Sequence, residues 1–296
     1  MGIKAKGKPG APPDDAALSA VEIKGRVMMI GTAEEVIARV DASLAAAPEV
    51  PDDFDLDDAG VVEGDVANNP IFVEKLERRI RSVTRGPDLL KDNLVELHPP
   101  REGKHCLVLD IDYTIFDLGT PGEHAGEKIR PHLHEFLESA YEHYDIVIWS
   151  ATGMKWVEGK MRQLGVLDHE RYKVACLMDC LSMVTVTMDQ YGTFNCKPLQ
   201  VLWAHYRGFY GEENTIMFDD LRRNFVFNPQ QGLRIKAFRK SRTQGAGDDE
   251  LLRLRDYLAL IAPKASFADL DHRRWERYVR KRADRLPAPP AYAWRE

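Results

Sequence analysis

A short apolar run that ends in two carboxylates restricts the fold more than any other feature of the chain. Residues 106–109 read Cys-Leu-Val-Leu, and Asp110 and Asp112 follow closely. The run has the length and composition of a buried strand. A buried carboxylate is costly unless it is paired or binds a cation. Because ligands of parallel sheets bind beyond the carboxyl ends of the strands, the pair predicts a cation site there, and Mg²⁺ is the expected ion.

The chain beyond this strand alternates between strand and helix. We expect strands at 106–109, 145–149 and 214–218, and helices at 131–141 and 154–164. Such alternation is typical of a parallel sheet with crossover helices. The sequence therefore predicts an α/β fold, a Rossmann-like parallel sheet flanked by helices.

A second β pattern interrupts this alternation. Residues 172–198 contain the alternating stretch Val-Thr-Val-Thr at 184–187 and a Tyr-Gly turn signal at 191–192, which predict a small antiparallel insert beside the site. No segment is long enough to form a large cap. Residues 251–262 and 267–282 are expected to form terminal helices.

The N-terminal third has a different character. Residues 27–30 resemble a short strand, and a capping box at 32–35 predicts a helix that ends near residue 45. The acidic segment 48–65 predicts a solvated linker, or a site for a basic partner. Apolar residues at helical spacing predict a further helix at 69–85.

Composition excludes several classes of function. A formal net charge of -6, from 41 Lys and Arg against 47 Asp and Glu, disfavours nucleic acid as a partner. No apolar stretch approaches the ~20 residues of a membrane span, and no secretion signal is evident. The four cysteines lack zinc-type spacing, which indicates reduced core cysteines in a nuclear or cytosolic protein.

Polar residues also follow the later strands. Ser150 and Thr152 are suited to hold phosphate oxygens, although a strand-end Ser is also a common helix cap. Lys197 precedes a proline that fixes the backbone, so its ammonium could reach a phosphate or simply be solvated. Asp219 and Asp220 end another strand, where one of them could complete an oxygen shell around Mg²⁺ or cap a helix.

The order of these groups along the chain is itself a signal. A carboxylate pair, a hydroxyl, a lysine and a second carboxylate pair follow one another at successive strand ends, as in the haloacid dehalogenase (HAD) superfamily. The chain resembles the FCP/SCP-type branch, which dephosphorylates the C-terminal domain (CTD) of RNA polymerase II, and within it the ubiquitin-like-domain-containing CTD phosphatases. The resemblance is carried by LVLDIDYTIFD at 107–117, YDIVIWSAT at 144–152, NTIMFDD at 214–220 and WERY at 275–278. Tyr113 and the Asp219-Asp220 pair distinguish this group from the small CTD phosphatases, which typically carry Glu and Asp-Asn at those positions.

The resemblance implies roles for individual residues. It makes Asp110 the nucleophile that forms an aspartyl-phosphate, and Asp112 the general acid and then the general base. It implies Mg²⁺ ligation by the Asp110 carboxylate, the Asp112 main-chain carbonyl and Asp220, with Asp219 acting through water. Asn224 would orient the metal site. The residues implied to bind the phosphoryl oxygens are Thr114, Ser150, Thr152 and Lys197.

The resemblance also implies a function. The expected activity is that of a Mg²⁺-dependent protein serine/threonine phosphatase, acting on nuclear 26S proteasome subunits and on phosphopeptides of the polymerase CTD type. A nuclear monomer that docks on the proteasome regulatory particle is expected, with no nucleic acid or membrane partner. Two alternatives stay open, a catalytically silent scaffold and a small-molecule phosphatase of the same superfamily.

Four regions are expected along the chain. Residues 1–32 are predicted to be a partial ubiquitin-like segment without the first hairpin and main helix of that module. Residues 33–98 would be a helical and acidic linker, residues 99–262 the phosphatase domain, and residues 263–296 a basic C-terminal helix and tail.

Overall fold

The computed structural model of the protein describes residues 19–23, 26–30, 66, 69–84, 94–122, 124–188 and 192–286. The chain divides into two units, residues 1–57 and 58–296, which are described separately. In the first unit, β1 (Ser19–Ile23) and β2 (Arg26–Ile30) pair as an antiparallel hairpin, and β2 confirms the strand expected at 27–30. The predicted helix from Thr32 and the acidic segment 48–65 lie outside the described residues.

The second unit is built on a six-stranded sheet with the order β10-β9-β4-β5-β6-β3. The strands are β3 (Leu94–Glu96), β4 (His105–Leu109), β5 (Tyr144–Trp149), β6 (Val174–Met178), β9 (Thr215–Asp219) and β10 (Gly232–Arg234). All run parallel except β3, which pairs antiparallel with β6 at the edge. The chain moves outward from β4 to β6 and then crosses to β9. The junction of β4 and β9 is therefore the topological switch point, where open α/β sheets bind their ligands.

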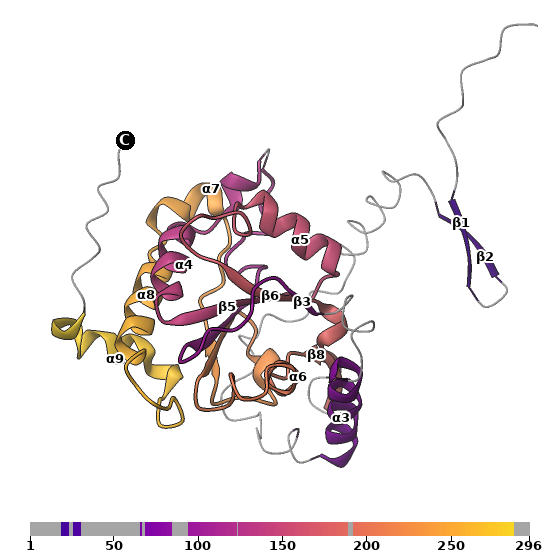
Figure 1. Cartoon of the computed structure of the whole chain (residues 1–296). Helices are drawn as coiled ribbons and strands as arrows, with labels where there is room; N and C mark the ends of the chain where they lie inside the picture. Colours follow the sequence, from indigo (N-terminus) through magenta and orange to yellow (C-terminus); the bar gives the residue numbers. More distant parts are fainter. Residues whose placement is uncertain are drawn as a thin grey trace, which may run out of the picture. The chain divides into compact units, whose positions relative to one another are not determined.

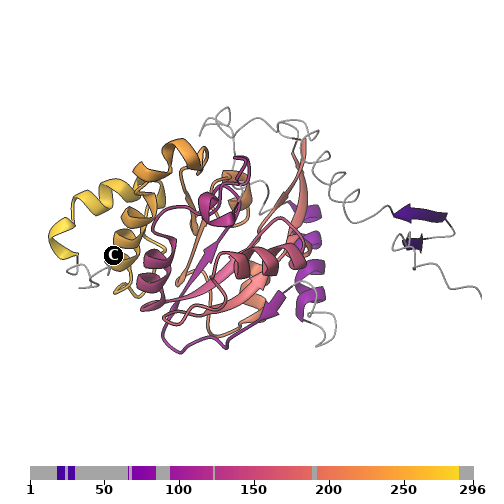
Figure 2. The same ribbon diagram turned by 90° about the horizontal axis from the view of Figure 1, so that it is seen from above.

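Helices cover both faces of the sheet (Figures 1 and 2). Leu107 and Leu109 of β4 face one layer and Cys106 and Val108 the other, as strand alternation requires. The first layer contains α4 (Leu133–Tyr141), α5 (Met154–Gln163) and α8 (Glu250–Ile261), and the second contains α3 (Pro70–Thr84) and α6 (Gln200–His205). Burial on both faces explains why the central strands read as continuous apolar runs.

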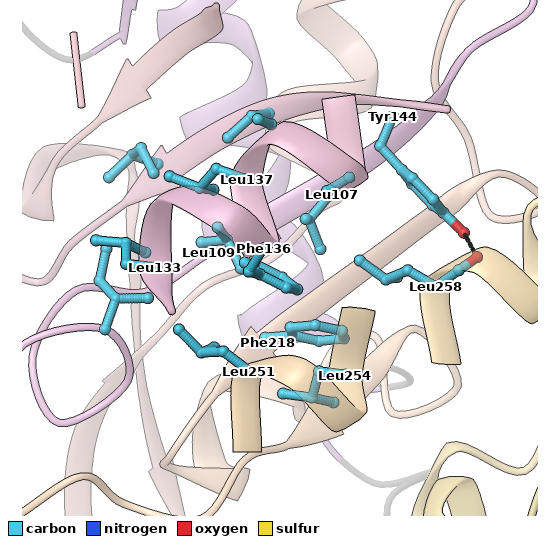
Figure 3. Packing of buried hydrophobic residues seen from close by; sticks show 14 of the residues in the cluster. Leu107, Leu109, Leu133, Phe136, Leu137, Tyr144, Phe218, Leu251, Leu254 and Leu258 are labelled. Carbon is cyan, nitrogen blue, oxygen red and sulfur yellow. Dashed lines mark hydrogen bonds between the residues drawn. The ribbon is translucent and has the colours of Figure 1, made fainter. Parts of the chain in front are cut away.

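The layer of α4 and α8 forms the larger core (Figure 3). Phe218 of β9 lies between Phe136 of α4 and Leu254 of α8, and all three side chains are buried. Each buried side chain of this size contributes about 1.5–3 kcal/mol. The Tyr144 hydroxyl donates a hydrogen bond of 2.9 Å to the carbonyl of Leu258, which fixes the start of β5 against α8.

The predicted α/β fold is confirmed, with one correction in the insert. Val174–Met178, inside the predicted insert 172–198, is the third parallel strand of the main sheet. Only β7 (Val184–Met188) and β8 (Gly192–Cys196) form the antiparallel pair. The five side chains of β6 are all buried, so this strand lacks the alternation that marks a two-faced strand.

Segments on both sides of the predicted phosphatase domain pack into the same unit. Phe72 and Leu76 of α3 are buried in the second layer, and β3 extends the sheet, although both elements fall in the predicted linker 33–98. The helix expected at 267–282 is shorter, because the Asp271 side chain accepts a hydrogen bond from the Arg273 amide and starts a tight turn before α9 (Trp275–Arg280). The exact domain boundaries stay predictions.

The connections around the sheet contain small elements of their own. Among the described residues they include α7 (Ser241–Gln244) and the 3₁₀ helices Ala125–Lys128, Cys180–Ser182, Arg222–Phe225, Gly245–Gly247, His272–Arg274 and Ala283–Arg285. None of these forms a separate cap domain. Within the described part of the chain, no helix has the length and apolar character needed to cross a membrane.

A buried histidine links the C-terminal segment to α8. His272 is 4% exposed, and its Nδ1 lies 2.7 Å from the Tyr257 hydroxyl. Burial lowers the pKa of His272 to about 4, although the charge of Asp271 opposes this shift. The folded protein therefore keeps this imidazole neutral at pH values where an unfolded chain protonates it.

We predict that this histidine makes folding pH-dependent. As the pH falls from about 6.5 towards 4, the unfolded state binds a proton that the folded state does not, so the free energy of unfolding decreases. Below pH 4, this effect of His272 should have lowered the free energy of unfolding by about 3 kcal/mol. His272→Asn keeps an acceptor for Tyr257 but cannot titrate. Its free energy of unfolding, measured by urea denaturation at a series of pH values, should therefore fall less towards acid pH than that of the wild type. Parallel profiles for both proteins would contradict the prediction.

Candidate active site

A tight loop follows β4 and carries Asp110 and Asp112. The carbonyl of Ile111 accepts hydrogen bonds from the amides of Thr114 at 3.3 Å and Phe116 at 3.0 Å. Tyr113 has a φ of 59°, in the left-handed region that is strained for a bulky residue. Its carbonyl accepts a 2.6 Å hydrogen bond from the Phe238 amide. Contacts from distant parts of the chain thus hold this strained loop in place.

A buried lysine lies between two strand ends at the switch point. The Nζ of Lys197 donates to Asp110 Oδ1 and, at 2.7 Å, to Asp219 Oδ2. Thr114 Oγ1 donates to the other oxygen of Asp110 at 3.2 Å, and Asn224 Nδ2 donates to Asp219 Oδ2 at 2.8 Å. The lysine side chain is fully buried. Burial alone would lower the pKa of Lys197, but the attraction of the two carboxylates outweighs it and raises that pKa.

Asp220 adds a third carboxylate to this group. Ligand atoms of Asp110, Asp219 and Asp220 lie within 4.8 Å of one another, and all three residues are buried. Burial and the charge of Asp219 raise the pKa of Asp220 to about 7. Burial also raises the pKa of Asp110 well above its ordinary value, although Lys197 opposes this and Asp219 adds to it. Three carboxylates share one ammonium, so with all four groups ionised the cluster carries two excess negative charges.

This cluster fits a divalent cation. All its donors are carboxylate oxygens, which Mg²⁺ prefers, and their separation allows them to share one ion. A charge of +2 would neutralise the excess negative charge that, in addition to burial, raises the pKa of Asp110 and Asp220. The residues present therefore match the metal site that the sequence predicts at this edge of the sheet.

Asp112 lies beside the cluster but does not belong to the three-carboxylate group. Its Oδ1 is buried and has no hydrogen-bond partner among the described residues. Burial raises the pKa of Asp112 to about 6, against the attraction of three nearby lysines. An unpartnered carboxyl oxygen with a pKa in this range has the properties of a proton donor at near-neutral pH.

The hydroxyls predicted to bind phosphate lie at the end of β5. Ser150 is buried, and its Oγ lies 2.8 Å from Thr152 Oγ1 and accepts a 3.2 Å hydrogen bond from the Thr152 amide. Since β5 pairs in parallel with β4, these hydroxyls lie at the same edge of the sheet as Asp110. Thr114 and Lys197, in contrast, contact Asp110 directly.

Two groups near the site were not predicted from the sequence. Lys128 and Lys160 both approach the ring of Phe116, and Arg239 stacks 4.3 Å from the centre of the Tyr113 ring. These residues come from separate elements and have no motif spacing. Only the fold brings them to the site, so sequence reasoning had no signal for them.

A buried arginine supports the site from behind. Arg130 forms two hydrogen bonds with the Asp248 carboxylate, at 2.8 and 2.9 Å. Its remaining nitrogen donates to the carbonyls of Thr114 at 3.0 Å and Lys236 at 2.9 Å. One side chain thus joins the loop after β4, the segment after β10 and the start of α8.

Comparison with known proteins places this site in a family. A sequence model described as "NLI interacting factor-like phosphatase" matches residues 105–270, which include every predicted site residue. "Ubiquitin-like domain-containing CTD phosphatase 1" of Homo sapiens is 46% identical over 285 residues, covering 95% of this chain and 85% of the relative. The chain belongs to this family of phosphatases. Relatives of the same name from Drosophila melanogaster and Xenopus laevis are 46% and 45% identical with the same coverage.

Solved structures were also compared. Fission yeast RNA polymerase II CTD phosphatase Fcp1 bound to beryllium fluoride aligns with a TM-score of 0.37 and 14% identity, over 54% of this chain and 63% of that chain. A second structure of Fcp1 aligns with a TM-score of 0.34 and 14% identity, over 61% and 62%. The family assignment rests on the sequence matches, which confirm the resemblance inferred from the motifs and the prediction of a phosphatase.

We predict that Lys197 is required for stability as well as for activity. Lys197→Met should lower the free energy of unfolding in EDTA by about 3 kcal/mol, because it leaves buried carboxylates without their cation. Urea denaturation at pH 7 measures this, with the exposed Lys155→Met as the matched control. A loss in Lys197→Met no larger than in the control would contradict the role of this ion pair.

Proposed function

We propose that the protein is a Mg²⁺-dependent protein serine/threonine phosphatase that works through an aspartyl-phosphate. The observation that carries the proposal is the assembly, at the switch point of the sheet, of Asp110 with Lys197, Thr114 and the two carboxylates at the end of β9. A carboxylate nucleophile, a fixed cation and a metal-type donor set are the groups that phosphoryl transfer needs.

In the first step, a carboxylate oxygen of Asp110 attacks phosphorus. The bond between that oxygen and phosphorus forms while the bond between phosphorus and the Ser or Thr oxygen breaks. Asp112 gives its carboxyl proton to the departing oxygen, so the product is a neutral hydroxyl. The unpartnered Oδ1 of Asp112 supports this role, because no contact within the described residues has to break before the proton moves.

In the second step, water hydrolyses the acyl-phosphate. Asp112, now a carboxylate, takes a proton from the attacking water. The bond between Asp110 and phosphorus breaks, which releases inorganic phosphate and restores the carboxylate of Asp110. Lys197 and the hydroxyls of Thr114, Ser150 and Thr152 would hold the phosphoryl oxygens where negative charge accumulates.

The residues that would hold Mg²⁺ are the carboxylates of Asp110 and Asp220, the main-chain carbonyl of Asp112, and Asp219 through water. Asn224 donates to Asp219 and so would orient it toward the site. A bound divalent cation supplies positive charge that lets an anionic carboxylate approach an anionic phosphoryl group. The excess negative charge of the ionised cluster supports the assignment of these residues to a metal site.

The substrate proposal rests on the family. The relatives' name, which includes "CTD phosphatase", supports phosphopeptides of the RNA polymerase II CTD type. From the resemblance in sequence we also propose nuclear 26S proteasome subunits as substrates. The same resemblance is the basis for proposing docking on the regulatory particle and a monomeric state. The connections around the site, which lack a cap domain in the described part of the chain, support a substrate as large as a protein loop.

The phosphatase mechanism predicts a strict requirement for Asp110 and for metal. Phosphate release from a phosphoserine peptide should fall by about a thousandfold or more in Asp110→Asn, which is near-isosteric but cannot form the acyl-phosphate. EDTA should abolish release by the wild type, and added Mg²⁺ should restore it. Circular dichroism checks that the variant is folded. Turnover by folded Asp110→Asn would remove this residue as the nucleophile.

The same assay separates the alternatives. Hydrolysis of small phosphate esters without any release from phosphopeptides would favour a small-molecule phosphatase. A folded, Mg²⁺-loaded protein that releases nothing from either substrate would favour a scaffold.

A second prediction concerns the metal site alone. Asp220→Asn should raise the Mg²⁺ concentration needed for half-maximal activity about tenfold or more, because a charged ligand is lost. The same change should not reduce stability in EDTA, because it removes a like charge from a crowded cluster. Asp168→Asn, which alters an acid whose side chain is 71% exposed, is the control. An unchanged Mg²⁺ requirement in Asp220→Asn would exclude Asp220 as a ligand.

A further inference from the structure

Two lysines converge on one buried aromatic ring beside Asp112. The ammonium nitrogen of Lys160 lies 3.9 Å from the centre of the Phe116 ring, and that of Lys128 lies 5.0 Å from it. Phe116 is 1% exposed, and its backbone pairs with that of Asp112 in an isolated β-bridge. Lys160 comes from α5 and Lys128 from the 3₁₀ helix Ala125–Lys128, so the fold alone brings them together.

The charges of these lysines are not balanced by neighbouring carboxylates of their own. Within the residues that the structure describes, neither ammonium forms an ion pair, and Lys128 donates only to the carbonyl of Leu118, at 3.1 Å. The two lysines also repel each other: after burial, the charge of Lys128 is the next cause that lowers the pKa of Lys160. Among the described residues, the acid that acts on Lys160 is Asp112. An anion that binds to both lysines attracts each of them and so offsets their mutual repulsion.

The position of the pair indicates where such an anion comes from. Lys197 and Thr114 contact Asp110, where the scissile phosphoryl group would bind. Lys128 and Lys160 both contact Phe116, whose backbone pairs with that of Asp112. Together with Lys197 they act on the charge of Asp112, which in the proposed mechanism protonates the leaving oxygen. Groups on this side of the site therefore face the substrate residue that loses its phosphate and the residues next to it in the chain.

We propose that Lys128 and Lys160 form a subsite for a negatively charged side chain adjacent to the phosphoserine or phosphothreonine of the substrate. This inference rests on the protein phosphatase function proposed above and adds a determinant of substrate choice. The anion is a carboxylate or a second phosphate, both of which bind ammonium groups. Contact with the Phe116 ring, and with Trp156 at 5.2 Å from the Lys160 nitrogen, holds the cations in position.

Matched phosphopeptides test this subsite in the full-length, Mg²⁺-loaded protein. A parent peptide carries one phosphoserine with neutral flanks, and a scan places one Glu, or one second phosphoserine, at each position on either side. For the wild type, at least one acidic position should raise kcat/KM about fivefold over the parent, mainly through a lower KM. Glu and phosphoserine at that position then distinguish a carboxylate from a phosphate as the preferred anion.

The variants decide whether the lysines are responsible. Lys128→Gln and Lys160→Gln should each reduce the ratio of kcat/KM for the acidic peptide to kcat/KM for the neutral parent peptide. In the double variant this ratio should be close to one. Lys160→Arg keeps the charge and should keep the preference. Lys155→Gln, an exposed lysine on the same helix, should leave the wild-type ratio unchanged.

Four results would overturn the proposal. A wild type with no acidic preference, or a preference that survives in the double variant, would exclude the subsite. Equal loss on all peptides together with a shifted pH profile of kcat would make the lysines positioning residues for Asp112. If the wild type releases phosphate from no phosphopeptide, the proposed function fails first, and the subsite falls with it.

Discussion

The arrangement of the whole site depends on one buried ammonium group held between two carboxylates. Lys197 bonds to Asp110 at the end of β4 and to Asp219 at the end of β9, and none of the three is exposed by more than 6%. Such groups are stable in the interior only when they satisfy one another. The lysine therefore fixes the relative position of two neighbouring strand ends, and any substrate or ion that binds between them meets an arrangement that already exists.

The same constraint leaves the fully ionised site with an excess of negative charge. One lysine cannot balance Asp110, Asp219 and Asp220, and the raised pKa of Asp110 and Asp220 reflects this deficit together with burial. A cluster with this deficit is suited to exchange protons or to hold a cation, which is the property that phosphoryl transfer uses. Repulsion between the three carboxylates thus lowers the stability of the site without a cation, and the same repulsion increases its affinity for one.

The sequence predicted the parallel sheet and the order of the site residues, because both depend on local patterns. Asp110 follows the apolar strand β4 and Asp219 is the last residue of β9, and neighbouring parallel strands end at a common edge. The strand β6 was misplaced because the alternating stretch at 184–187 and the turn signal at 191–192 led to one insert over 172–198, although β6 is buried like the other central strands. Lys128 and Lys160 could not be predicted at all, since their proximity depends on how α5 packs above the loop at Phe116. Tertiary contacts of this kind leave no local pattern.

The links that complete the site are far apart along the chain, which has a consequence for its biosynthesis. Lys197 joins Asp110 across 87 positions, and Arg130, which holds the loop carbonyl of Thr114, reaches Asp248 across 118. A ribosome releases Asp110 long before the residues that secure it. The Asp110 carboxylate therefore lacks its lysine until residue 197 has emerged, and the loop after β4 lacks this support until residue 248 has emerged, so the candidate site can be completed only late in translation.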